Sequence, residues 1–232
     1  MRHSVDATLR GHLRHVRWIG GGSGAGKSTV ATQLAARYAM QLYQCDTTIG
    51  KHGRANPDDA PLFNAFVAMD MDQRWVNRSP EEMLATFHGF QGERFDLIVE
   101  DLLALNEDRP ILAEGFRLLP RLVSPLLVHP NQAVWLLPSP QFRRAALHSR
   151  GSTWEIPKKT SNPERALANL MERDARFTDE LREETRALNL RTVEVDVDVG
   201  VDELINDVAD CLDLRNKPDR TGGSIPPNRG TR

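Results

Sequence analysis

The feature that most constrains this chain is a run of glycines followed by a lysine and a serine, GGSGAGKS at residues 21–28. The run fits the pattern G-x-x-x-x-G-K-[ST], with the apolar stretch VRWIG before it and the helical pattern STVATQLAARYA after it. Glycines let successive backbone N–H groups point to one concave side, where the positive end of the following helix also lies. This context favours a loop that binds nucleotide phosphates over an ordinary glycine-rich turn.

Each residue type in the pattern has its own expected role. We expect Lys27 to reach the β- and γ-phosphates and the Ser28 hydroxyl to coordinate Mg²⁺. Thr29 supplies a further hydroxyl near the α-phosphate. The residues predicted to contact the nucleotide are Gly21, Gly22, Ser23, Gly24, Ala25, Gly26, Lys27, Ser28 and Thr29.

Length, charge and cysteine content exclude several other classes of protein. A chain of 232 residues fits one α/β domain with an insertion or two. Its 30 basic and 32 acidic residues leave a net charge of −2, so no overall positive field predicts a nucleic-acid partner. No apolar run approaches membrane-spanning length, and Cys45 and Cys211 are too few for a disulfide framework. We therefore expect a cytoplasmic protein with neither membrane nor nucleic acid as a partner; its oligomeric state is not predicted.

Short apolar runs alternate with longer helical patterns, which is typical of a parallel sheet with crossover helices. The expected strands are 15–20, 42–45, 110–114, 133–137 and 191–197, and the expected helices include 27–40, 140–149, 163–188 and 201–212. A five-stranded parallel sheet of order 2-3-1-4-5 with helices on both faces would follow, a three-layer α/β fold.

The remaining segments predict one domain over residues 1–215, with a disordered tail at 216–232. Residues 58–90 are mostly helical and predict an inserted lobe, while the polar segment 150–163 predicts either a lid or a surface loop. The stretch FDLIVEDLLAL at 95–105 resembles a strand ending in acids, but its apolar residues recur at helical spacing. We interpret it as a helix, so that Glu114 ends the neighbouring strand.

Three further stretches, LYQCD, ILAEGFRLLP and WLLPSPQFRRAALHSRG, accompany the phosphate loop in the order found in one known group. With them the chain resembles the small P-loop kinases, which include nucleoside monophosphate kinases, shikimate kinase and chloramphenicol phosphotransferase. The resemblance covers about residues 16–212, and only the phosphate loop is highly specific. It implies the P-loop NTPase fold, ATP as phosphoryl donor, Mg²⁺ and a small-molecule acceptor.

The resemblance also implies roles for residues at the ends of the second and third strands. Asp46 would accept or orient the proton of an attacking hydroxyl and contact the acceptor, unless it only caps a turn. Arg117 would contact the acceptor, although the proline of the adenylate-kinase pattern is missing beside it. Glu114 would hold Mg²⁺ through water or orient the acceptor, the alternative being a structural ion pair with a lysine.

Several arginines complete the expected site. Arg144 and Arg150 fall where such kinases direct arginines at the nucleotide and the transferred phosphoryl group, which a guanidinium binds through two oxygens. Arg74 of the lobe would contact the acceptor. Either Arg173 or Arg176 would meet the phosphates, the alternative being ion pairs on an exposed helix face.

Three functions compete on this basis. The first is an ATP- and Mg²⁺-dependent kinase that acts on a hydroxyl or phosphate of a small molecule. The second is a nucleoside monophosphate kinase proper, and the third is a regulatory nucleotide-binding protein with little turnover. A GTPase is excluded, because the guanine-reading pattern NKPD at 216–219 follows a helix and not a buried strand. The identity of the acceptor is not predicted.

Overall fold

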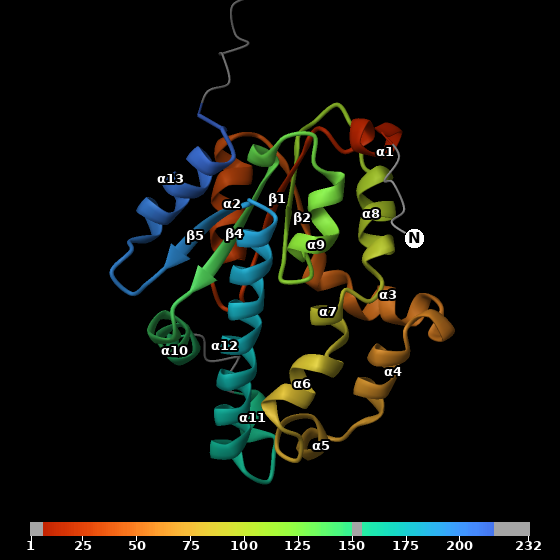
Figure 1. Ribbon diagram of the computed structural model, residues 1–232, viewed down its shortest axis with the longest axis vertical. Coiled ribbons are helices and arrows are strands. Elements are labelled where there is room, and N and C mark those ends of the chain that lie inside the picture. Colours follow the sequence, from red (N-terminus) through yellow and green to blue (C-terminus); the bar gives the residue numbers. More distant parts are fainter. Residues whose placement is uncertain (1–6, 150–154, 216–232) are drawn as a thin grey trace, which may run out of the picture.

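The computed structural model describes residues 7–149 and 155–215. In this part of the chain, a five-stranded parallel sheet of order β2-β3-β1-β4-β5 forms the centre of the molecule (Figure 1). The strands are β1 Val16–Gly21, β2 Gln41–Gln44, β3 Ile111–Glu114, β4 Ala133–Pro138 and β5 Arg191–Val195. The predicted fold class, strand positions and strand order are therefore confirmed, and the order is that of a P-loop three-layer fold.

Helices cover both faces of this sheet. The longer ones are α2 Lys27–Arg37, α8 Phe95–Leu103, α10 Pro140–Ser149, α12 Pro163–Ala187 and α13 Val201–Cys211. The shorter ones are α1 Ala7–His12, α3 Ile49–Ala55, α4 Pro61–Ala68, α5 Met71–Trp75, α6 Pro80–Thr86, α7 His88–Gln91, α9 Pro120–Val123 and α11 Glu155–Lys158. Helices α2 and α13 lie on one face, and α8, α9 and α12 lie on the other (Figure 1).

Side chains from the two faces of the sheet are buried in two separate cores, because successive side chains of a strand point to opposite faces. Trp18 and Trp135 are fully buried in the core beneath α8, α9 and α12. Ile19 and Val134, each one residue away, are fully buried in the core beneath α2 and α13. Strands buried on both faces are typical of an all-parallel sheet.

The strand register brings the functional segments to one edge. Glu114, the last residue of β3, pairs with Ile19 of β1 on one side and with Gln44 of β2 on the other. The glycine loop after β1 and the turn after β2 therefore begin beside Glu114. This is the carboxyl edge, where ligands bind in open α/β sheets.

The segment predicted as a lobe folds into the helices α4 to α7 beyond that edge, where α5 and α6 contact α12 (Figure 1). Two of its short helices, α5 and α6, begin with side-chain caps. Asp70 and Gln73 form a reciprocal capping box at the start of α5, and Ser79 accepts a hydrogen bond from the Glu82 N–H at the start of α6.

The helix predicted over 95–105 is confirmed as α8, which begins at Phe95 and ends at Leu103. Helix α2 ends earlier than predicted, because Ala39 adopts a left-handed φ of 52° that turns the chain into β2. Residues 150–154 of the predicted lid and the whole predicted tail, 216–232, lie outside the described residues. Within the described ranges, no helix is both long and apolar enough to cross a membrane.

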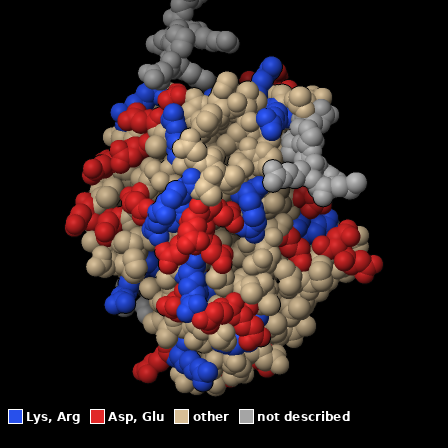
Figure 2. Space-filling view, in the orientation of Figure 1, with Lys and Arg blue, Asp and Glu red and all other residues tan. Residues whose placement is uncertain are grey.

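Acidic and basic side chains alternate on the face that α12 presents (Figure 2). Arg182 of this helix pairs with Asp179 and Glu194, and Glu184 pairs with Arg121. Such neighbouring opposite charges give the face no extended field of one sign.

Candidate active site

The glycine loop joins β1 to α2 and forms one wall of a cavity of about 120 Å³ lined by residues 23–28 and Phe116. Gly24 has a φ of 77°, a conformation that L side chains rarely adopt, and a Cβ here would lie 2.5 Å from Nη1 of Arg143. Helix α2 begins at Lys27, so the unpaired N–H groups of its first turn also lie at this cavity. The loop thus has the backbone shape that an anionic group requires.

Lys27 lies buried within the loop, with 6% of its surface exposed. Its Nζ donates to the Gly22 carbonyl at 2.8 Å. Burial lowers the pKa of Lys27, and the carboxylates of Asp46 and Glu114 act in the opposite direction. The ammonium group is therefore bonded to the phosphate loop and interacts electrostatically with two acidic groups.

Asp46 and Glu114 are those two acidic groups, and each is held by a hydrogen bond. Asp46 lies in a turn directly after β2, where its Oδ2 accepts from the Phe116 N–H at 3.2 Å. Glu114 Oε1 accepts from Nε2 of Gln44 at 3.1 Å. Burial raises the pKa of both carboxyls, while the charge of Lys27 opposes this rise. The positive charge of Lys27 thus acts on two partly desolvated carboxylates.

The residues that the sequence assigns to Mg²⁺ have the right donor chemistry. Oε2 of Glu114 is buried and has no hydrogen-bond partner among the described residues, and Ser28 carries its exposed hydroxyl at the start of α2. Mg²⁺ prefers oxygen ligands and commonly binds through one or two protein groups plus water and substrate phosphates. No group of three or more His, Cys, Asp or Glu in the described ranges could hold a metal by itself. A shared site with nucleotide oxygens fits these residues.

The burial of Glu114 predicts a pH-dependent change in stability. Because its pKa is raised above the ordinary 4.5, the ionised form costs folding free energy at higher pH. We expect Glu114→Gln to raise the melting temperature by about 2–4 °C at pH 8, which corresponds to about 1 kcal/mol, and to have no effect below the ordinary pKa. Thermal unfolding between pH 4 and 8 measures this, with exposed Glu100 changed to Gln as the control. A variant less stable than wild type at pH 8 would contradict it.

Gly115 sets the position of Asp46, because it follows β3 with a φ of 150° and lies against the Asp46 turn. A Cβ at Gly115 would lie 2.2 Å from Sγ of Cys45 and 2.6 Å from Oδ1 of Asp46. Close approach of backbone and side chain therefore requires glycine here.

We expect Gly115→Ala to lower the free energy of unfolding by about 2–5 kcal/mol through backbone strain and overpacking. Denaturant unfolding measures the loss. The control is Gly200→Ala, because a Cβ at Gly200 meets no atom within 4 Å. Equal stability of the two variants would show that the space around Gly115 is not as described.

Arg117 lies behind the turn that carries Asp46, with 3% of its surface exposed. Its Nη1 donates to the Cys45 carbonyl at 3.1 Å, and its Nη2 donates to the Arg94 carbonyl at 3.3 Å. These contacts position the turn. Direct contact with an acceptor, the role that the resemblance implies, stays a prediction.

Arg74 ties two helices of the lobe together. Its Nε donates to the Phe66 carbonyl at 3.0 Å, and its Nη2 donates to the Val67 carbonyl at 2.8 Å, so that α5 is held against the end of α4. Its guanidinium also lies 4.8 Å from the centroid of the Phe66 ring. An additional contact of Arg74 with an acceptor stays a prediction.

On α10 the arginine directed at the phosphate loop is Arg143, which sequence reasoning missed. Arg143 donates to the carbonyl of Ser23 and to the carboxylate of Asp174, whereas the neighbouring Arg144 is exposed. Adjacent helical residues point about 100° apart, so only one of the pair can face the loop. Arg150 lies outside the described residues.

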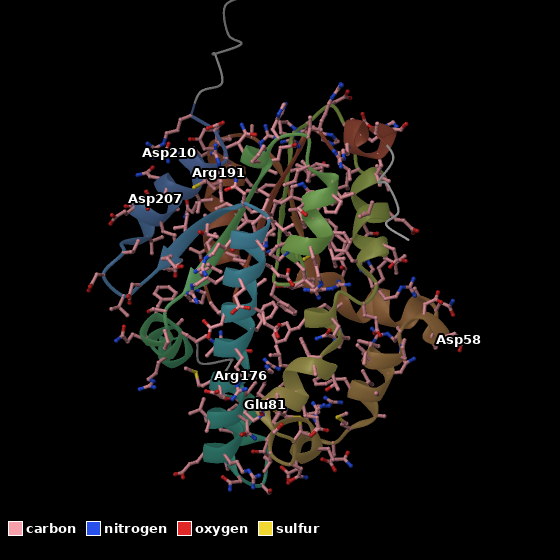
Figure 3. All side chains as sticks on the ribbon, in the orientation of Figure 1. Asp58, Glu81, Arg176, Arg191, Asp207 and Asp210 are labelled. Carbon is pink, nitrogen blue, oxygen red and sulfur yellow. The ribbon has the colours of Figure 1, made fainter. Side chains whose placement is uncertain are left out.

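Arg173 and Arg176 of α12 have different surroundings. Arg173 is buried and donates through Nε and Nη2 to Oδ1 of Asp174, at 2.9 and 2.7 Å. Arg176 lies at the surface and pairs with Glu172 of its own helix at 2.7 Å and with Glu81 of α6 at 2.5 Å (Figure 3). The ion-pair alternative is thus what the structure shows for Arg176, while Arg173 belongs to an interior cluster.

A larger cavity of about 440 Å³ lies beside the phosphate loop, between the lobe, α11 and α12. It meets the smaller cavity at Ser23, Gly24 and Phe116, which line both. Its aromatic wall, as we call it below, consists of Phe63, Phe66, Trp75, Phe87, Phe90 and Phe116. The volume is in the range typical of small-molecule sites.

The sheet order, the glycine loop after β1 and the acids at the ends of β2 and β3 define the class: a P-loop α/β protein. No protein-family model matches this chain, and no curated protein matches its sequence. Solved structures that it is similar to include an uncharacterized protein from Eubacterium ventriosum ATCC 27560, at 16% identity and a TM-score of 0.45, covering 86% of this chain and 98% of that chain. A gluconokinase from Sinorhizobium meliloti 1021 matches at 20% identity and a TM-score of 0.42, covering 86% of this chain and 92% of that chain. Both likenesses are too distant to indicate a substrate.

Proposed function

We propose that this chain is an ATP- and Mg²⁺-dependent kinase that transfers the γ-phosphoryl group to a small molecule, with a hydroxyl as the favoured acceptor and a phosphate as the alternative. The observation that carries the proposal is that the glycine loop with Lys27, the turn with Asp46 and the strand end at Glu114 lie together at the carboxyl edge of the sheet. Phosphoryl transfer needs a phosphate cradle and a cation at the transferred group, and a hydroxyl acceptor also needs a base.

In the proposed reaction the acceptor oxygen forms a bond to the γ-phosphorus, the bond from that phosphorus to the β,γ-bridging oxygen breaks, and ADP leaves. Asp46 takes the proton of the attacking hydroxyl. Lys27 and the N–H groups of the loop stabilise charge on the phosphate oxygens. Arg143, held by Asp174 and by the Ser23 carbonyl, is fixed next to the loop and adds a second positive charge.

Mg²⁺, when bound between Ser28, Glu114 and the nucleotide, would neutralise charge on the phosphate oxygens. Residues of the chain itself position the two carboxylates. Glu114 is kept in place by Gln44, and Asp46 is kept in place by the Phe116 N–H. Oδ1 of Asp46 also accepts from Sγ of Cys45 at 3.5 Å, so both carboxylates are anchored to the protein.

The test is acceptor-dependent release of ADP from Mg-ATP by the purified chain, screened against pooled alcohols, nucleosides, nucleotides, aromatic acids and antibiotics. We expect one pool to raise ADP release above the rate without acceptor. Tight ATP binding with no such increase in any pool would instead support the alternative of a regulatory nucleotide-binding protein.

A further inference from the structure

The large cavity beside the phosphate loop has walls that a sugar or a polyol would not match. Five of its six aromatic side chains form a continuous series of ring contacts, with Phe66 5.6 Å from Trp75 and 5.3 Å from Phe87, measured between ring centroids. Phe87 continues to Phe90 at 4.8 Å, and Phe90 to Phe116 at 5.6 Å. A molecule rich in hydroxyls would lose hydrogen bonds to water against such rings. A flat ring system would gain both burial and edge or stacking contacts.

Among the described residues, the polar part of the same cavity holds more basic than acidic groups. The titratable residues of that part of the lining are His88, Arg143, Arg173 and Asp174. Burial and the nearby Arg117 lower the pKa of His88 to about 4, so this histidine is neutral at pH 7. Asp174, which is 1% exposed, pairs with both guanidinium groups. Arg173 is itself only 6% exposed and lines the cavity, and a buried cation at the wall of a cavity favours an anionic ligand there.

Arg173 is the member of this pair that faces the rings. Its guanidinium carbon lies 5.2, 5.1 and 5.0 Å from the ring centroids of Trp75, Phe87 and Phe90. Nε and Nη2 are bonded to Asp174, while Nη1 has no hydrogen bond to any described residue. Arg143, in contrast, lies at the loop end of the cavity and contacts Ser23. The positive charge beside the aromatic wall is therefore provided by Arg173.

We propose that the acceptor bound in this cavity is an aromatic acid: a ring-bearing, mainly apolar molecule whose rings lie on the aromatic wall and whose acidic group is bound by Arg173. This proposal specifies the acceptor of the proposed kinase reaction, so the role of the ligand as an acceptor rests on the proposed function. Because Ser23, Gly24 and Phe116 line both cavities, a molecule placed here lies next to the phosphate loop. Nucleotides, which are also ring-bearing anions, differ from it in carrying a polar sugar between ring and acid.

The test uses two fluorescent probes with the same ring system, titrated into the full chain without ATP. 1-Anilinonaphthalene-8-sulfonate carries an acidic group, and N-phenyl-1-naphthylamine lacks it. We expect the sulfonate to bind at least about tenfold more tightly, the range for one hydrogen bond to a charged group. Arg173→Met should abolish this preference while changing the affinity for the amine less than about twofold, and Arg173→Lys should keep most of the preference.

A second pair of variants tests the location. Leu167→Trp adds bulk to a residue that lines the cavity, and we expect it to weaken both probes at least about tenfold. Leu188→Trp makes the same change just after the far end of α12, at a residue that is 42% exposed, and should change neither affinity. Equal binding of the two probes to the wild-type chain, or unchanged binding to Leu167→Trp, would overturn the proposal. Because the titrations need neither ATP nor turnover, their result is independent of whether the chain is a kinase.

Discussion

Replacing Lys27 by Ala is expected to lower acceptor-dependent phosphoryl transfer by about 10³-fold or more, the range found when a transition-state cation or donor is removed. The ammonium group is buried, is bonded to the Gly22 carbonyl of the phosphate loop and interacts electrostatically with two carboxylates. Its loss removes the positive charge of the phosphate loop and leaves the negative charges of Asp46 and Glu114 without its opposing effect. Both effects oppose the approach of a polyanion. ADP release at saturating acceptor measures the rate.

The matched control for this variant is Lys51→Ala. Lys51 has 72% of its side chain exposed and pairs with Asp101 at the surface. Its removal should leave transfer within about twofold of wild type, because exposed ion pairs contribute little. Circular dichroism shows whether each variant folds. A folded Lys27→Ala variant with more than a tenth of wild-type activity would contradict the role given to Lys27.

Asp46→Asn is expected to lower kcat by about 10²–10⁴-fold if the acceptor is a hydroxyl, the usual contribution of a general base. The amide retains an oxygen that can accept the Phe116 N–H, so the turn should stay in place. Asparagine cannot accept the proton. If the acceptor is an ionised phosphate, no proton needs to be removed and the loss should be far smaller.

The pH dependence of kcat gives a second measure of the same residue. Burial raises the pKa of Asp46 above its ordinary 3.8, so activity should fall as the pH is lowered through that raised value. The Asp46→Asn variant should lose this acid limb. Asp58→Asn, changed at the position labelled in Figure 3 well away from the loop, is the control and should keep it. An unchanged acid limb in Asp46→Asn would assign the limb to another group.

Most of the fold was predictable because its signals are local. The apolar runs that predict β1 and β4 are buried on both faces, and the periodicity of 95–105 correctly predicted α8 where its acids resemble a strand end. Short elements such as α3 and α9 were not predicted. Their helical form depends on contacts with distant segments, which a local pattern does not contain.

The candidate site was likewise predictable where its residues are contiguous in sequence and not where they are distant. The glycine loop is contiguous in sequence, so its residues could be named together. The interior cluster joins Arg143 of α10 to Asp174 of α12, 31 residues apart, and the aromatic wall joins the lobe to the end of β3. No spacing rule connects such positions. The pair of arginines at 143–144 did indicate an arginine near the loop, but the helix phase that selects Arg143 was visible only in the structure.

The most direct test of the central claim is the acceptor-dependent release of ADP from Mg-ATP, measured in parallel for the wild-type chain and for Lys27→Ala. We expect at least one acceptor pool to raise the rate for the wild-type chain and no pool to do so for the variant. An equal rate with and without every acceptor in the wild-type chain, despite ATP binding, would contradict the claim that this site transfers a phosphoryl group.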